Sequence, residues 1–276
     1  MKNIRQYTSE ECEALCKKIR RTILDLIHRT KSPHIGSSFS CVELLIALYF
    51  KILSVSPEYP EDTNRDRFIL SKGHACPTLY VVLAERGFLS TEDLNGFSVD
   101  GGLLEQHPNR DLQKGIEAST GSLGHGLSIG VGMSLAGKVD QSTYITYVLL
   151  SDGELNEGSV WEAAMFAGHH KLNNLVAIVD YNKIQALGFV KDIVSLEPLS
   201  ERWQSFGWAT KEIDGHDLQE IEDTLRTVPF EKDRPSVVIA HTIKGKGVSF
   251  MENELLWHYR TPDSDEYQKA LKELSE

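Results

Sequence analysis

The sequence predicts an α/β protein of three layers, in which a mainly parallel sheet is flanked by helices. Short apolar runs suited to buried strands alternate along the chain with amphipathic helical runs. Strands that are apolar throughout are typical of parallel sheets covered on both faces. We expect a single domain over residues 1–276, with a helical N-terminal segment at about 8–55 and a C-terminal helix at about 264–276.

Two helices are predicted in the N-terminal segment. Thr8 and Glu11 have the spacing of a capping box, and apolar residues then recur at the i, i+3, i+4 interval, which predicts a helix over residues 10–28. A second helix is expected to begin after Ser40, because Glu43 takes the capping-box position ahead of another apolar run.

The remaining elements follow in alternation. Four apolar runs are predicted strands, at residues 68–70, 144–150, 175–179 and 237–240. Helices are predicted between them, at residues 161–170 and 218–226. A turn and a helix cap at residues 214–217 precede the second of these helices.

Composition restricts the class of protein. The net charge of −11 argues against nucleic acid or an anionic membrane as a partner. No apolar run approaches the roughly 20 residues that span a bilayer, and the N-terminal residues show no secretory signal. The cysteines Cys12, Cys16, Cys41 and Cys76 have neither zinc-site nor redox spacing, and we interpret Cys12 and Cys16 as core residues. A cytoplasmic protein is therefore expected.

Polar residues follow two of the predicted strands. Asp152 and Gly153 come directly after the run 144–150, and Asn182 follows the run 175–179. In open parallel sheets, ligands bind at the carboxyl ends of the strands. A carboxylate and an amide oxygen suit Mg²⁺ or Ca²⁺, and Gly153 would let the backbone approach a phosphate. The alternative is that both sequences are only turns.

The same residues resemble the thiamin-diphosphate-binding motif. That motif normally opens Gly-Asp-Gly and ends in an asparagine, whereas this chain has Ser151 at the first glycine. Serine is small, so we expect the replacement to be tolerated. Further segments resemble transketolase motifs and occur in the order of that family, at residues 31–38, 70–75, 105–108, 120–128, 242–247 and 257–258. His125 stands where many members carry glutamine.

The resemblance implies a thiamin-diphosphate-binding fold and a set of site residues. Mg²⁺, with Ca²⁺ as a possible substitute, would be bound by Asp152, Asn182 and the carbonyl of Ile184. The cofactor would be contacted by Ser37, His74, Gly121, Ser122, Leu123, Gly153, Glu157, Asn182, Lys244 and His258. The catalytic histidines would be His34, His107 and His258.

Other polar residues receive separate interpretations. The resemblance places Glu157 at a subunit interface, where it would help to link two cofactor sites; a surface salt bridge is the alternative. The remaining histidines are interpreted as structural or solvated, and these are His28, His169, His170, His216 and His241.

The resemblance covers only the N-terminal part of a full-length transketolase. We therefore expect a subunit that transfers a two-carbon ketol unit from a ketose phosphate to an aldose only with a separate pyrimidine-binding C-terminal subunit. The expected assembly is a heterotetramer of two plus two chains, with sites at chain interfaces. A piece of a longer enzyme is the alternative.

Two other functions stay open at this point. One is a different thiamin-diphosphate enzyme, either the α chain of a 2-oxo acid dehydrogenase or a deoxyxylulose-phosphate synthase. The other is a non-catalytic regulatory homologue. In addition, Tyr259 and Arg260 follow His258 where the family frequently has glycine, which leaves a specialised sugar substrate open.

Overall fold

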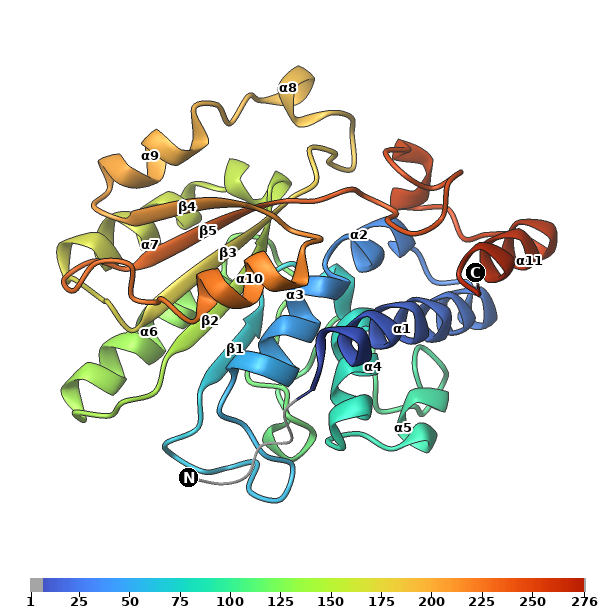
Figure 1. Cartoon of the computed structure of the whole chain (residues 1–276), viewed down its shortest axis with the longest axis horizontal. Helices are drawn as coiled ribbons and strands as arrows, with labels where there is room; N and C mark the ends of the chain where they lie inside the picture. The colour runs from blue at the N-terminus through green and yellow to red at the C-terminus, as the bar shows by residue number, and fades with distance from the viewer. Residues whose placement is uncertain (1–6, 276) are drawn as a thin grey trace.

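Five strands form the centre of the structure, a computed structural model that describes residues 7–275. They pair in the order β1-β2-β3-β5-β4, and every pair is parallel, as the sequence predicts. The strands are β1 (Arg67–Leu70), β2 (Thr146–Ser151), β3 (Leu175–Tyr181), β4 (Ala209–Asp214) and β5 (Ser236–His241). Their carboxyl ends therefore share one edge of the sheet (Figure 1).

Helices cover both faces of the sheet (Figure 1). One hydrophobic cluster includes Leu149 and packs α1 (Ser9–Thr30), α2 (Ile35–Ser40), α3 (Val42–Ala47), α4 (Cys76–Arg86), α10 (Leu218–Leu225) and α11 (Ser264–Glu273). A second cluster includes Val148 and Leu150 and packs α6 (Gly126–Val139), α7 (Gly158–His169) and α9 (Leu199–Ser205). Successive strand residues thus enter opposite cores, which accounts for strands that are apolar throughout.

Short elements complete the described chain. They are α5 (Thr91–Asn95), α8 (Val190–Ile193), the π turn η1 (Leu48–Ile52) and the 3₁₀ turns η2 (Gly73–Ala75), η3 (Leu112–Lys114), η4 (Gly153–Asn156) and η5 (Leu255–His258). Three of these turns, η2, η4 and η5, carry residues of the predicted site.

The predicted capping boxes have different outcomes. The Thr8–Glu11 box is present at the start of α1. The Ser40–Glu43 box is wrong: the Ser40 hydroxyl donates to the Asp180 carboxylate at 2.6 Å, and Glu43 forms a buried ion pair with Arg20. Both side chains therefore bind residues distant in sequence instead of forming the local helix cap.

The strand β4 was not predicted. It lies at the edge of the sheet, and only Ala209 and Ile213 of its residues are buried, so it lacks a continuous apolar run. The four cysteines are free and buried, which confirms the interpretation of Cys12 and Cys16 as core residues. No helix within residues 7–275 combines the length and the apolar character needed to cross a bilayer.

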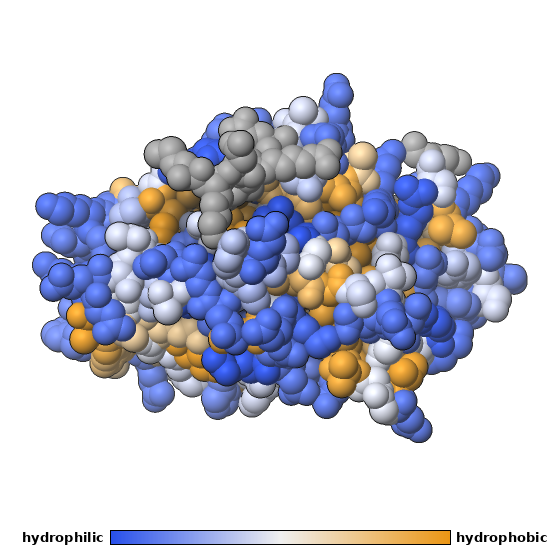
Figure 2. Space-filling model, turned by 90° about the horizontal axis from the view of Figure 1, so that it is seen from below, coloured by the Kyte–Doolittle hydropathy of each residue, from blue (hydrophilic) through white to orange (hydrophobic). Residues whose placement is uncertain are grey.

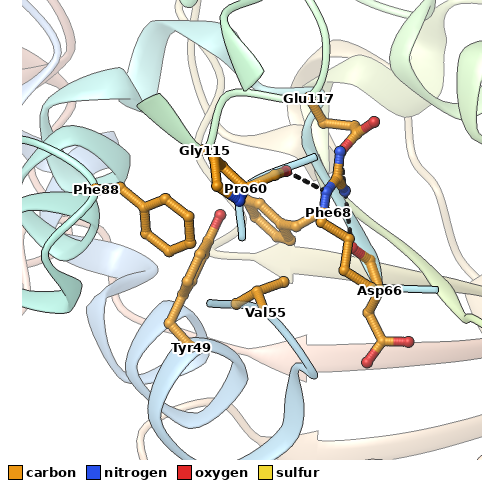
Figure 3. Close-up of a pocket in the computed structure, with 9 residues that line it drawn as sticks. Tyr49, Val55, Pro60, Asp66, Phe68, Phe88, Gly115 and Glu117 are labelled. Carbon is orange, nitrogen blue, oxygen red and sulfur yellow. Dashed lines mark hydrogen bonds and ion pairs between the residues drawn. The ribbon is translucent and has the colours of Figure 1, made fainter. Parts of the chain in front are cut away.

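A small hollow beside the amino end of β1 is structural. It has a volume of about 20 Å³ and is lined by Tyr49, Phe68, Phe88 and neighbouring residues (Figure 3). Arg65 pairs with Glu117 at 2.5 Å beside it. This volume suits a single water molecule.

The surface seen from below is mainly hydrophilic (Figure 2).

Candidate functional site

A cavity of about 250 Å³ lies at the carboxyl edge of the sheet. Most predicted site residues line it: His34, Ser37, His74, His107, Gly121, Leu123, Asp152, Gly153, Asn182, Ile184, Lys244 and His258. These residues come from segments far apart in sequence, and the ends of β2 and β3 bring Asp152 and Asn182 together.

The floor of the cavity contains an acid that forms no direct ion pair. Asp152 is only 1% exposed and forms no ion pair among residues 7–275. Its carboxylate accepts hydrogen bonds from the backbone N–H of Gly153, at 2.7 Å, and of Lys183. Burial, reinforced by the nearby Asp180, raises the pKa of Asp152 to about 7. A buried carboxylate in this state favours a bound cation.

The other predicted metal ligands lie beside Asp152. The Asn182 side-chain oxygen accepts the Ile184 N–H at 3.2 Å, and the Ile184 carbonyl accepts from the Lys244 ammonium at 2.9 Å. The described residues contain no cluster of three His, Cys, Asp or Glu side chains suited to a metal. A carboxylate, an amide oxygen and a carbonyl fit Mg²⁺, which keeps water or phosphate oxygens as its other ligands.

A buried ion pair that sequence reasoning missed lies beneath the floor. The side chains of Lys72 and Asp180 are both fully buried and in contact. Asp180 also accepts hydrogen bonds from Ser40, at 2.6 Å, and from Thr242. Although burial alone would raise the pKa of Asp180, Lys72 holds it below its usual value. The position of Asp180 at the end of β3, next to a motif residue, was the available signal.

Three histidines form one wall of the cavity. The ring centroids of His34 lie 5.1 Å from His74 and 5.2 Å from His258. Burial lowers the pKa of His34 to about 4 and that of His258 to about 3, with neighbouring His and Lys side chains acting in the same direction. Burial also places the pKa of His74 well below its ordinary value. The wall is therefore neutral at physiological pH.

The backbone of His34 is in the left-handed region, with φ 73°, at the start of α2. Such a conformation costs on the order of 1–3 kcal/mol outside glycine and is concentrated at functional sites. The His34 N–H donates to the His258 carbonyl at 2.9 Å. This bond fastens the start of α2 to η5 and so holds the two histidines together.

The glycine-rich loop packs against the same wall. Gly121 has φ +145°, and a Cβ there would lie 2.8 Å from the His107 ring. A Cβ on Gly73 would lie 2.8 Å from the Gly121 nitrogen. Close backbone approach therefore needs glycine at both positions. These contacts explain why His74, His107 and the loop meet although each belongs to a different motif.

Two predicted contacts do not line the cavity. Ser122 and Glu157 are exposed on its outer side. Glu157 packs on the glycine-rich loop, because a Cβ on Gly124 would lie 2.7 Å from the Glu157 Cβ. No ion pair of Glu157 occurs within residues 7–275, which leaves it available to a neighbouring chain.

Four lining residues are not among the predicted contacts, namely Ser151, Gln185, Ala186 and Tyr259. Tyr259 is 63% exposed, and its ring centroid lies 4.6 Å from that of His258. The unusual residue after the Trp-His motif was the signal for Tyr259. Gln185 and Ala186 lie beyond the motif residue Ile184 and carried no signal of their own.

The histidines interpreted as structural or solvated lie outside the cavity lining. His169 and His170 are exposed, and His241 pairs with Glu212 at the surface. His28 contacts the carbonyl of Pro262. His216 contacts Glu43 at 3.0 Å and accepts the Ile243 N–H at 2.8 Å, so it fastens the segment that precedes Lys244.

Comparison with known proteins gives one family and a set of similar chains. The family described as "Transketolase, thiamine diphosphate binding domain" matches residues 12–274. An apulose-4-phosphate transketolase subunit of Phocaeicola vulgatus is 44% identical, over 97% of this chain and 95% of that protein. The "6-deoxy-6-sulfo-D-fructose transketolase subunit SqwG" of a Clostridium species is 41% identical, over 93% of each chain.

Longer relatives match over the same region. Human "Transketolase" is 34% identical over 99% of this chain but only 44% of its own length. Among solved structures, transketolase from Campylobacter jejuni aligns with a TM-score of 0.90 and 29% identity. The match to that structure covers 98% of this chain and 43% of the solved one. The chain thus spans about two fifths of the length of the solved transketolases it matches.

Proposed function

This chain belongs to the transketolase family through its thiamine diphosphate binding domain, and we propose that it is the N-terminal subunit of a split, Mg²⁺-dependent transketolase. It would transfer a two-carbon ketol unit from a ketose phosphate to an aldose acceptor. The observation that carries this proposal is the single cavity that combines an unpaired buried acid, a buried lysine and a neutral histidine wall.

The floor residues would hold the metal and the anionic end of the cofactor. Asp152, Asn182 and the Ile184 carbonyl would bind Mg²⁺. Lys244 and His74 can donate to a diphosphate, and Gly153 leaves room for it. Further cofactor contacts are proposed for Ser37, Gly121, Ser122, Leu123, Glu157, Asn182 and His258.

The histidine wall would act at the reacting carbon. Thiamin diphosphate, when bound, supplies a nucleophilic carbon and an electron sink. His34, His107 and His258 would orient the sugar and donate to the oxygen on which negative charge develops. The neutral rings of His34 and His258 suit this task, because each can donate from one nitrogen and accept at the other.

A separate pyrimidine-binding subunit would complete the site, in an assembly of two plus two chains. Subunit names in relatives of similar length support a partner, as does the greater length of the solved transketolases. Exposed apolar side chains close in sequence to lining residues would lie against that partner; these are Leu187, Phe189, Val194 and Leu256. The buried free cysteines support a cytoplasmic enzyme.

The substrate is proposed as a sugar phosphate of specialised structure. The similar relatives are named for apulose 4-phosphate and for 6-deoxy-6-sulfo-D-fructose. Tyr259 stands at the mouth of the cavity, where it would contact an incoming sugar and help to select it.

Reconstitution with the partner tests the proposal. The mixture should transfer a two-carbon unit between sugar phosphates only when both chains, thiamin diphosphate and Mg²⁺ are present. Asp152→Ala should abolish this activity, whereas Asp140→Ala, on the surface at the end of α6, should not. Full activity of Asp152→Ala would favour the regulatory alternative, and full activity of this chain alone would contradict the split assembly.

A further inference from the structure

We infer that Lys244 is a positioning residue, which fixes His258 in the tautomer that carries its proton on Nε2. This inference rests on the proposed function, since it concerns how a histidine of that site meets the substrate. It assigns His258 the role of a hydrogen-bond donor and identifies the group that imposes this role.

The contact between the two side chains determines the tautomer. The Lys244 ammonium lies 2.8 Å from Nδ1 of His258, and Lys244 is only 1% exposed. Burial lowers the pKa of Lys244 to about 8, so at neutral pH its side chain is still an ammonium. An ammonium has donors and no acceptor, and Nδ1 of His258 therefore accepts. A neutral imidazole has one protonated nitrogen, and the proton of His258 therefore lies on Nε2.

The electrostatic environment keeps the His258 ring neutral. Burial, followed by the positive charge of Lys244, lowers the pKa of His258 to about 3. His34, His74 and Tyr259 are the other ring neighbours of His258, and none of them offers a carboxylate. His258 therefore stays neutral at physiological pH, with a single N–H.

Backbone contacts hold Lys244 beside His258. A Cβ on Gly36 would lie 3.1 Å from Cγ of Lys244 and 3.2 Å from the carbonyl oxygen of Trp257. The Gly245 N–H donates to the Gly36 carbonyl at 3.0 Å. The first turn of α2 is thus wedged between the segments that carry Lys244 and His258, so their contact is fixed by packing.

The Lys244 ammonium also connects two functions of the cavity. One of its N–H groups donates to the Ile184 carbonyl at 2.9 Å, and another donates to His258. The third is available to an anion in the cavity. The Nε2–H of His258 would then stabilise negative charge on a substrate oxygen by hydrogen bonding, without transfer of its proton.

Nuclear magnetic resonance of ¹⁵N-histidine-labelled full-length chain tests the inference without cofactor or substrate. The His258 signals are assigned by their loss in His258→Gln. In the wild type at neutral pH they should report protonated Nε2 and unprotonated Nδ1. Lys244→Met should shift the ring toward the Nδ1–H tautomer and raise its pKa, whereas Lys244→Arg should preserve the wild-type pattern.

Lys246→Met is the matched control, since Lys246 lies two residues away and pairs with Glu252 instead. It should leave the His258 signals unchanged. A protonated Nδ1 in the wild type would overturn the inference, as would an unchanged tautomer in a folded Lys244→Met. If Lys244→Met does not fold, the wild-type spectrum and a Lys244→Leu variant, which also lacks a donor, decide.

A second readout separates this inference from the proposed function. Thiamin diphosphate with Mg²⁺ is titrated by calorimetry into the wild-type chain reconstituted with its partner subunit. Absence of binding would contradict the proposed function even if the tautomer is as inferred. Binding together with the wrong tautomer would overturn only the role of Lys244.

Discussion

The floor of the cavity and its histidine wall differ in the elements that form them and in the effect of burial on their ionisable side chains. The floor, formed by Asp152 and Asn182, lies at the ends of two neighbouring strands. The wall, formed by His34, His74 and His258, comes from a helix start and two short turns. Burial raises the pKa of Asp152 in the floor and lowers those of the wall histidines.

This difference shows how one cavity can receive both a cation and an anionic cofactor. The floor has a buried carboxylate that forms no direct ion pair, and a metal would provide a cation in contact with it. The wall and Lys244 offer hydrogen-bond donors to an anion. The floor depends on the hydrogen-bonded sheet, and the wall depends on close backbone contacts at glycines.

The largest effect is expected from breaking the ion pair beneath the floor. Lys72→Met leaves Asp180 buried without its cation, which should destabilise the chain by roughly 3–5 kcal/mol. Denaturant unfolding followed by circular dichroism measures this. Lys18→Met, which breaks an exposed pair with Glu85, should cost at most about 1 kcal/mol. Equal losses in the two variants would contradict the importance of the buried pair.

A smaller effect is expected from crowding the wall. Gly36→Ala places a methyl group against Lys244 and the Trp257 carbonyl, which should cost about 1–3 kcal/mol. Gly132→Ala is the matched control, because a Cβ there meets nothing within 4 Å. Thermal unfolding of both variants measures the difference. A Gly36→Ala protein as stable as the control would show that the wall is loosely packed.

The wall should also make stability depend on pH. The folded-state pKa of His34, about 4, lies below the unfolded value near 6.5, so the unfolded chain binds more protons between these values. This contribution to stability is present above about pH 6.5 and is lost as the pH falls toward 4. His34→Gln should therefore lose less stability than the wild type between pH 7 and pH 5.

The control for this pH dependence is His169→Gln, at an exposed position of α7. Melting temperatures of the three proteins are compared across the same pH range. The control should follow the wild-type slope. A His34→Gln slope identical to that of the wild type would contradict a neutral buried His34.

The smallest effect on stability is expected from Tyr259, at the mouth of the cavity. Tyr259 is 63% exposed, so Tyr259→Gly should change the free energy of unfolding by only about 0.5 kcal/mol. Because Tyr259 lines the mouth of the cavity, the variant should instead change KM for the donor sugar more than kcat. An unchanged KM would exclude Tyr259 from substrate selection.

The same two regions show what the sequence could predict. Asp152 and Asn182 each follow a predicted strand, and the carboxyl ends of parallel strands meet at one edge of the sheet. The position of Asp152 beside Asn182 could therefore be predicted from the sequence alone. The wall could be expected only from the resemblance to a family, because no periodicity relates His34 to His258 across the intervening chain. Both sets meet in the cavity.

Other features could not be predicted, for physical reasons. Ser40 and Glu43 have capping-box spacing, but partners distant in sequence take both side chains. Lys72 and Asp180 are charged residues that become fully buried, and only the fold shows that they pair. β4 is an edge strand in which only Ala209 and Ile213 are buried, so its sequence lacks the continuous apolar run that predicted the other strands.

The central claim is that the floor binds a metal together with the diphosphate of the cofactor. Calorimetric titration of thiamin diphosphate into the chain reconstituted with its partner subunit, with and without Mg²⁺, tests it most directly. We predict saturable binding that requires Mg²⁺ in the wild type and in Asp140→Ala, and a loss of at least about 100-fold in affinity in Asp152→Ala. Binding that is independent of Mg²⁺, or unchanged in Asp152→Ala, would contradict the account.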